Sequence, residues 1–266
     1  MSEYVFDQAW ERERDRLRSL QALYNGATTR HLASLGVTEG WSCLEVGCGT
    51  GGVATWLAEQ VGITGRVVAT DLDTRFVAEH RATNLEVRTH DIRSGAPEQA
   101  AFDLVHARAL VEHIPDHQTA VGHLLAAVRP GGWVLIEDVD FGVPMAAALA
   151  RYTSPPEHGP IIERLYTAGE AVFAAAGADA SYGTQLVHQL EAAGFEQIGG
   201  ELRAPIVCGG SEQWTRGTAE QLAEHFVRTG LITADDLSWF LRISDEPSVH
   251  YATPCMATAW GRRPTN

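Results

Sequence analysis

The chain has 266 residues, 45% of them hydrophobic, and a formal net charge of −14. The length allows one large α/β domain or a core that carries an inserted cap. The negative charge argues against nucleic acid as a partner, because phosphate binding relies on clustered Lys and Arg.

Four cysteines, Cys43, Cys48, Cys208 and Cys255, lack the spacing of a zinc site, and we expect them to be buried free thiols. No Asp or His cluster has the spacing of a divalent-metal site, so no metal centre is expected. The absence of a long apolar run and of a signal-peptide pattern predicts a cytoplasmic protein without a membrane span. The absence of a G-x-S-x-G motif excludes the hydrolase interpretation.

The predicted elements begin with an amphipathic helix from about 6 to 24, because apolar residues such as Phe6 and Trp10 recur at helical intervals. A second helix is predicted around 28 to 35, ending at Gly36. Strands and helices then alternate, with strands near 42–46, 66–70, 85–89, 102–106 and 133–137 and helices near 52–61, 74–80 and 117–128. This alternation predicts a parallel sheet covered on both faces.

The pattern changes after Asp138, where aromatic-rich helical segments interrupt it. A helix near 184–193, a strand near 196–207 and a last strand near 249–260 return to the core pattern. We therefore expect a single domain over 1–266, with an N-terminal helical cap at 1–36 and substrate-lid insertions at 139–182 and 211–246.

A glycine-dense turn follows the first predicted strand, in the sequence CLEVGCGTGG from Cys43 to Gly52. Glycines let the backbone turn tightly and approach a ligand, and the next helix offers unpaired N–H groups to it. Gly47, Gly49 and Gly52 satisfy the dinucleotide pattern G-x-G-x-x-G, which alone is weak evidence. The turn therefore predicts a nucleotide-cofactor loop.

Glu45, Gly47, Gly49 and Gly51 form an acidic residue, one spacer and glycines at alternate positions. This arrangement resembles the first motif of the class I S-adenosylmethionine-dependent methyltransferases. The later strands resemble that family's further motifs in order, at 67–72, 85–92, 102–108 and 128–138. The run from Glu112 to Asp116 resembles the small-molecule branch of the family.

The resemblance implies a Rossmann-like, doubly wound α/β fold, a seven-stranded sheet that is mostly parallel with an antiparallel last strand, plus helical lid insertions. It implies S-adenosylmethionine as cofactor, with Glu45 at the methionine end, Asp71 at the ribose hydroxyls and Asp91 at the adenine amino group. The expected cofactor residues are Tyr24, Glu45, Gly47, Cys48, Gly49, Gly51, Asp71, Leu72, Asp91, Ile92, Ala107 and Arg108. The spacing of Asp71 from the loop suits NAD equally well.

His113 is the candidate general base, because imidazole titrates near neutral pH and His113 follows the fourth strand, at the sheet edge where open α/β folds bind ligands. Alternatively, it packs against the cofactor or holds the turn at Pro115. The candidate acceptor pocket, which could equally be lid core, consists of Phe141, Tyr152, Tyr166, Trp214 and Tyr251.

The predicted function is methyl transfer to a small, partly hydrophobic metabolite, with O-methylation favoured. The predicted enzyme is a monomer or homodimer whose partner is a small-molecule acceptor, without nucleic acid or membrane. Three alternatives stay open: a protein that keeps S-adenosylmethionine bound for a cyclisation or rearrangement, an NAD-dependent oxidoreductase and a non-catalytic binding protein.

Overall fold

The computed structural model describes residues 6, 12–77 and 82–265. Trp10 and the last part of the helix predicted at 74–80 lie outside the described residues. The strands are β1 (Ser42–Val46), β2 (Arg66–Asp71), β3 (Leu85–Thr89), β4 (Phe102–Arg108), β5 (Val128–Asp140), β6 (Glu196–Arg203), β7 (Ile206–Cys208), β8 (His250–Ala252) and β9 (Cys255–Arg262). The helices are α1 (Glu13–Ser34), α2 (Gly52–Val61), α3 (His117–Ala127), α4 (Val143–Ala150), α5 (Gly159–Ala175), α6 (Leu186–Ala192), α7 (Trp214–Gln221), α8 (Ala223–Arg228) and α9 (Ala234–Ile243), with 3₁₀ turns η1 (Thr74–Phe76), η2 (Ile92–Ser94), η3 (Val111–His113), η4 (Pro156–His158) and η5 (Tyr182–Gln185).

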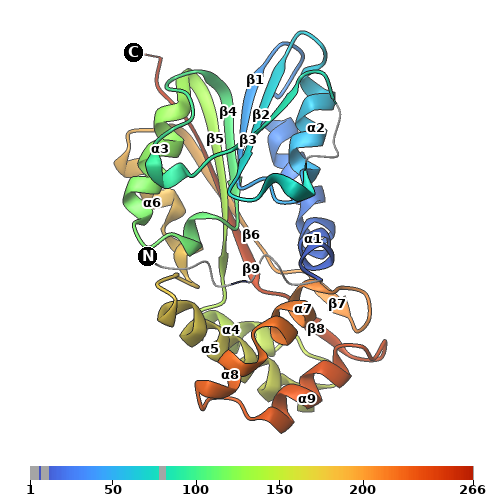
Figure 1. The fold of residues 1–266 in the computed structure, drawn as a ribbon. Coiled ribbons are helices and arrows are strands. Elements are labelled where there is room, and N and C mark those ends of the chain that lie inside the picture. Colours follow the sequence, from blue (N-terminus) through green and yellow to red (C-terminus); the bar gives the residue numbers. More distant parts are fainter. Residues whose placement is uncertain (1–5, 7–11, 78–81, 266) are drawn as a thin grey trace. The chain divides into compact units, whose positions relative to one another are not determined.

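The main sheet has seven strands in the order β3-β2-β1-β4-β5-β9-β6 and is mostly parallel with one antiparallel strand, which confirms the predicted fold class (Figure 1). Leu44 at the centre of β1 pairs with Val68 of β2 and Val105 of β4. Figure 1 shows α2 beside one face of the sheet and α3 and α6 beside the other. The carboxyl ends of β1, β2 and β4 therefore share one edge of the sheet, where the predicted cofactor motifs lie.

The core of this sheet is apolar because its central strands are covered on both faces. Residues of α2 such as Leu57 and Val61 are fully buried and pack in one cluster with Leu104 of β4 and Leu135 of β5. Burial of each such side chain stabilises the fold by about 1.5–3 kcal/mol.

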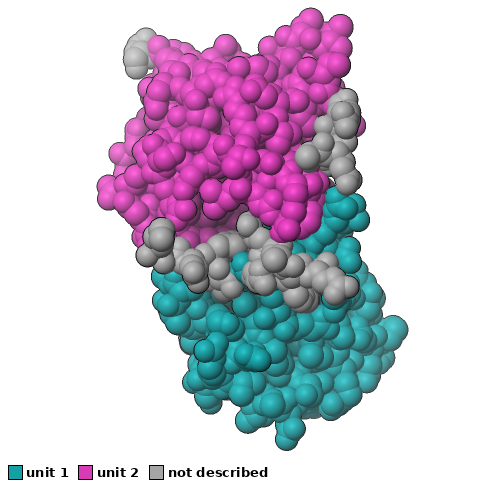
Figure 2. Space-filling view, in the orientation of Figure 1, with its two compact units in different colours: residues 1–23, 139–183, 202–256 teal, residues 24–138, 184–201, 257–266 magenta. Residues whose placement is uncertain are grey.

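The chain divides into two compact units (Figure 2). Unit 2 contains residues 24–138, 184–201 and 257–266, and unit 1 contains residues 1–23, 139–183 and 202–256. Both predicted lid insertions fall within unit 1. Their role as a substrate lid stays a prediction.

Three expected element boundaries were wrong. The strand predicted near 249–260 is two strands, β8 and β9, which belong to different sheets. The helices predicted at 6–24 and 28–35 belong, in the described part, to one helix, α1. The helix α1 runs without interruption from Glu13 to Ser34, and the hydroxyl of Thr29 donates to the carbonyl of Asn25 at 2.8 Å within the expected break. The strand predicted near 196–207 is two strands, β6 and β7, and β7 pairs with β8 in a separate antiparallel sheet.

Candidate functional site

The glycine loop connects β1 to α2 and is fixed by its own backbone. The amides of Gly47 and Cys48 donate to the carbonyl of Thr70 at 2.8 and 3.0 Å. Gly47 and Gly49 have φ values of 70° and 54°, which favour glycine. A Cβ on Gly47 would lie 3.1 Å from Leu110 Cδ1, whereas a Cβ on Gly49 would meet nothing within 4 Å. The loop is therefore packed closely at Gly47 and open at Gly49.

Asp71, at the end of β2, holds this loop in place. Its Oδ2 accepts the amide of Gly49 at 2.8 Å, and its Oδ1 accepts the amide of Asp73 at 3.0 Å. Burial raises the pKa of the Asp71 carboxyl, although these backbone donors partly oppose the shift. Each oxygen has a second lone pair, so the carboxylate can accept further hydrogen bonds from a ligand's hydroxyls.

Three other predicted cofactor residues, which follow β2 and β3, differ in exposure. Asp91 is the N-cap of η2, accepts the amide of Arg93 at 2.9 Å and forms an ion pair with the Arg93 guanidinium at 2.7 Å. Arg93 lowers the pKa of Asp91. Ile92 is buried, whereas Leu72 is 52% exposed. Binding of adenine by these residues stays a prediction.

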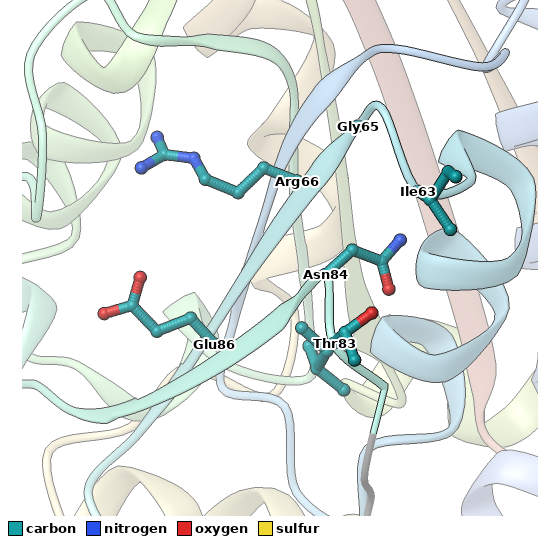
Figure 3. Close-up of a pocket in the computed structure, with 7 residues that line it drawn as sticks. Ile63, Gly65, Arg66, Thr83, Asn84 and Glu86 are labelled. Atoms are coloured by element: carbon teal, nitrogen blue, oxygen red, sulfur yellow. The ribbon is translucent and has the colours of Figure 1, made fainter.

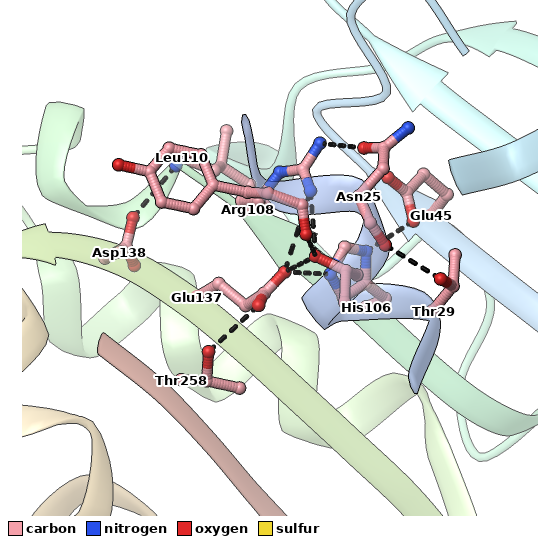
Figure 4. Close-up of polar contacts among 11 residues, drawn as sticks. Asn25, Thr29, Glu45, His106, Arg108, Leu110, Glu137, Asp138 and Thr258 are labelled. Carbon is pink, nitrogen blue, oxygen red and sulfur yellow. Dashed lines mark hydrogen bonds and ion pairs between the residues drawn. The ribbon is translucent and has the colours of Figure 1, made fainter. Parts of the chain in front are cut away.

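A buried polar network lies across β1, β4 and β5 of unit 2 (Figure 4). His106 stands at its centre, with Nδ1 at 2.6 Å from Glu45 Oε2 and Nε2 at 3.2 Å from Glu137 Oε2. Glu137 also accepts the hydroxyls of Thr28 at 2.6 Å and Thr258 at 2.9 Å. The acidic residue of the glycine-loop motif is thus one end of a chain of polar contacts.

The charges in this network stabilise one another. Burial opposes the imidazolium, but the two carboxylates outweigh it and raise the pKa of His106 to about 9. Burial also opposes the Glu137 carboxylate, yet the hydrogen bond and charge of His106 prevail and lower its pKa to about 2. At neutral pH we therefore expect His106 and Glu137 to be charged.

Arg108 ties α1 to the same network. Its Nη1 donates to Thr28 Oγ1 at 2.8 Å, and its Nη2 donates to Asn25 Oδ1 at 2.7 Å. Tyr24, from the same helix, and Ala107, beside Arg108 on β4, are both buried. Of the predicted cofactor residues, Arg108 is therefore connected to Glu45 through Thr28, Glu137 and His106.

The turn η3 carries the candidate base. His113 Nε2 lies 3.2 Å from Glu112 Oε1, and the two side chains are 8% and 3% exposed. Asp138, at the end of β5, anchors the turn through Oδ1, which accepts the amide of Leu110 at 2.9 Å and that of Glu112 at 3.4 Å. Burial raises the pKa of Asp138.

Sequence reasoning missed the network around His106. It assigned no role to Asn25, Thr28, Glu137, Asp138 or Thr258. One signal was present: Glu45 and His106 interrupt two strongly apolar strands and pair directly with each other in the sheet register. Polar side chains inside central strands need partners, so they predict a shared contact once the strand order is known.

Four of the five predicted acceptor residues are buried within unit 1, namely Phe141, Tyr166, Trp214 and Tyr251. The rings of Phe141 and Tyr166 are 6.3 Å apart. The Tyr166 hydroxyl donates to the carbonyl of Ala252, and that of Tyr251 donates to Glu212 Oε1, each at 2.7 Å. Tyr152 is separate from them at the surface, with 61% exposure. Contact with an acceptor stays a prediction for all five.

A pocket of about 340 Å³ lies at the amino ends of β2 and β3, at the opposite edge from the glycine loop. In Figure 3, Arg66 and Glu86 extend to one side of it, away from Ile63. The Asn84 side chain in its wall donates to the carbonyls of Ala58 and Gly62 at 2.8 and 2.7 Å. Since these contacts hold the turn after α2, we assign this pocket no functional role.

Within the described ranges, no group of three or more His, Cys, Asp and Glu side chains could hold a metal ion. Of the helices in the same ranges, none is long and apolar enough to cross a membrane.

Comparison with known proteins adds independent observations. A family model described as a methyltransferase domain matches residues 7–177. The chain is 33% identical to trans-aconitate 2-methyltransferase of Variovorax paradoxus over 111 residues, which cover 41% of this chain and 42% of that protein. It is 28% identical to methyltransferase str2 of Strobilurus tenacellus over 177 residues, which cover 65% and 61% of the two chains. The match therefore spans less than two thirds of either relative.

A solved structure supports the same fold. The match to phosphoethanolamine N-methyltransferase 2 of Haemonchus contortus, in complex with phosphomonomethylethanolamine and S-adenosylhomocysteine, has a TM-score of 0.55 at 20% identity, over 90% of this chain and 52% of that one. The family model covers more than half of the chain, so the chain belongs to the methyltransferase domain family, in agreement with the resemblance drawn from the glycine loop. The solved structure shows that it shares the fold of that enzyme.

Proposed function

We propose that this chain transfers a methyl group from S-adenosylmethionine to a small, partly hydrophobic metabolite, with oxygen as the favoured acceptor atom. The observation that carries the proposal is the loop from Gly47 to Gly51, which is open at Gly49 and lies beside the carboxylates of Glu45 and Asp71. The family match supports it, and so does the name of one relative, trans-aconitate 2-methyltransferase, which refers to a small molecule.

The residues present fit this cofactor. Open space at Gly49 lets a ligand approach the backbone, and the carboxylate of Asp71 has remaining acceptor capacity for ribose hydroxyls. The Glu45 carboxylate contacts His106 through Oε2 alone, so its Oε1 takes no part in that contact and suits a cationic amino group. The bound cofactor supplies an electrophilic methyl group, and the protein must hold the acceptor in line with it and exclude water.

His113 would accept a proton from an acceptor hydroxyl, and its neighbour Glu112 would favour the imidazolium that forms. We place the acceptor-binding residues in unit 1, whose interior is rich in aromatic side chains. Tyr152 is the candidate of this set with an exposed ring, and it therefore needs no rearrangement to meet a ligand.

Native mass spectrometry of the purified chain tests the cofactor. We expect bound S-adenosylmethionine or S-adenosylhomocysteine, and incubation with a panel of phenols and carboxylic acids should convert the first into the second. Bound NAD would contradict the proposal. Bound S-adenosylmethionine that is never demethylated, while a substrate rearranges, would favour the cyclisation alternative.

Calorimetry with S-adenosylhomocysteine tests the site. Asp71→Ala should weaken binding by about 1–3 kcal/mol, because a carboxylate that accepts hydroxyl hydrogen bonds is lost. Asp236→Ala is the matched control, since Asp236 also accepts a backbone amide, that of Thr233, but lies in the capping box of α9 in unit 1. Equal affinity of the two folded variants would remove Asp71 from the site.

Tyr152→Ala tests the acceptor half of the site. It should raise the KM for the acceptor and leave the affinity for S-adenosylhomocysteine within a few-fold. The reverse result would place Tyr152 at the cofactor instead.

A further inference from the structure

Both ring nitrogens of His106 face a carboxylate oxygen. Nδ1 lies 2.6 Å from Glu45 Oε2 and Nε2 lies 3.2 Å from Glu137 Oε2, and the histidine side chain has no exposed surface. An ionised carboxylate only accepts hydrogen bonds, and a neutral imidazole donates from one nitrogen alone. The geometry therefore requires a proton on both ring nitrogens if both carboxylates are ionised.

The surroundings of Glu137 indicate that its carboxylate is ionised. Its Oε1 accepts the hydroxyl of Thr258 at 2.9 Å, and its Oε2 accepts that of Thr28 at 2.6 Å. Arg108 Nη1 lies 4.0 Å from Oε2. Donors thus surround both oxygens, which favours the charged form. Glu137 has enough partners to hold one side of the His106 ring firmly.

The other side of the ring faces the glycine loop. Glu45 lies directly opposite His106 in the register of β1 and β4, two residues before Gly47. Asp138 follows Glu137 on β5, and burial together with the charge of Glu137 raises the pKa of Asp138. His106 therefore links Glu45, beside the loop, to Glu137, which has further partners of its own.

We propose that His106 is a positioning residue, clamped by Glu137, that holds the Glu45 carboxylate in place beside the glycine loop. The inference rests on the proposed function, because Glu45 would meet the cationic end of S-adenosylmethionine. Apolar side chains of similar volume would fill the same space at less cost in desolvation, so packing alone gives no reason for three buried ionisable groups. A fixed charge at the cofactor loop gives one.

Calorimetric binding of S-adenosylhomocysteine to His106→Gln, Glu45→Gln and the double variant tests the coupling. We expect each single variant to weaken binding about tenfold or more, and the double variant to bind no more weakly than the worse single one, since the two residues act as one unit. His31→Gln is the matched control, because His31 is also buried in unit 2 and pairs with Glu201 at 3.4 Å. It should bind as the wild type does.

Nitrogen-15 NMR of histidine-labelled apoprotein gives a readout that needs no cofactor. At pH 7.5 the His106 ring should show two protonated nitrogens, and in Glu45→Gln this signature should be lost or should titrate at lower pH. A neutral His106 ring in the wild type would overturn the proposal, even if His106→Gln fails to fold. So would wild-type affinity of a folded His106→Gln, or single effects that simply add.

The same data separate this inference from the proposed function. If the wild type binds no S-adenosylhomocysteine, the proposed function is wrong. A doubly protonated ring that depends on Glu45 would still show that His106 holds this carboxylate.

Discussion

The two units differ in how charged side chains are arranged in their interiors. In unit 2, four charged or chargeable side chains share one buried cluster, Glu45, His106, Arg108 and Glu137. In unit 1, two buried carboxylates have separate partners instead: Glu13 pairs with Arg16 on the next turn at 2.7 Å, and Glu212 accepts the hydroxyl of Tyr251. Most of the remaining interior of unit 1 is aromatic or aliphatic.

The two interiors suit different kinds of ligand binding. A cluster of fixed charges at the carboxyl edge of a sheet can orient a charged ligand, because its dipoles and charges are held before the ligand arrives. An aromatic interior offers shape and apolar surface instead. We therefore predict that unit 2 recognises the charged groups of the cofactor and that unit 1 selects the acceptor, and variants can test each half.

The largest effect should come from Glu137→Ala. The change leaves His106 and Arg108 without their shared carboxylate in a buried place, and we expect a loss of about 3–5 kcal/mol in the free energy of unfolding. Glu98→Ala is the control, because Glu98 contacts two arginines, Arg66 at 2.7 Å and Arg88 at 2.9 Å, at a half-exposed site. It should cost about 1 kcal/mol or less.

Urea unfolding of both variants measures the difference. Equal losses of unfolding free energy for Glu137→Ala and Glu98→Ala would mean that water reaches the His106 cluster. The charges of unit 2 would then be screened as they are at an ordinary surface.

Gly49→Val should have the next largest effect, on binding instead of folding. Gly49 and Gly194 both have positive φ, 54° and 74°, and open space where a Cβ would lie, so valine strains both by a similar amount, about 1–2 kcal/mol. Only Gly49 lies in the predicted cofactor loop. We expect Gly49→Val to weaken binding of S-adenosylhomocysteine by a factor of about a hundred or more, or about 2.7 kcal/mol, and Gly194→Val to leave it unchanged.

Calorimetry on the two folded proteins decides this prediction. Normal binding by Gly49→Val would show that the open side of the loop is not where the cofactor lies.

The fold could be predicted well because strands and tight turns each require particular residue types, which are visible in the sequence. Buried parallel strands appear as apolar runs, and the predicted strand at 42–46 and helix at 52–61 have the bounds found in the structure. The turn between them needs glycines because its backbone has positive φ, so Gly47 and Gly49 could be identified without knowing any contact.

The side-chain network could not be predicted in the same way. His106 was expected on a strand, but its partners Glu45 and Glu137 are 61 and 31 residues away in sequence. Their contact depends on β4 lying between β1 and β5, which is a property of sheet order. The aromatic residues of unit 1 posed the same difficulty, since helical spacing alone does not distinguish an exposed ring such as that of Tyr152 from a buried one such as that of Tyr251.

The stability of the protein should depend on pH through His106. Its folded pKa of about 9 exceeds the unfolded value of about 6.5, so its contribution is complete below pH 6.5 and is lost as the pH rises through 9. We expect the wild type to lose roughly 1–3 kcal/mol of this contribution between pH 6.5 and 9.5, and His106→Gln to lose less over the same range. Urea unfolding at several pH values measures both slopes. Parallel slopes would mean that His106 folds as a neutral ring.

The smallest effect on stability is expected for Asp138→Asn, and it should distinguish Asp138 from its neighbour Glu137 on β5. Asp138 accepts backbone amides through Oδ1, and its Oδ2 is buried without a hydrogen-bond partner among the described residues. Burial raises the pKa of Asp138, so a neutral amide should replace it at a cost of about 1 kcal/mol or less. Asp138→Ala removes the acceptor for the amides of η3 and should cost about 1–3 kcal/mol. If Asp138→Asn destabilises unit 2 as much as Glu137→Ala does, then Asp138 carries an essential charge and belongs to the His106 cluster.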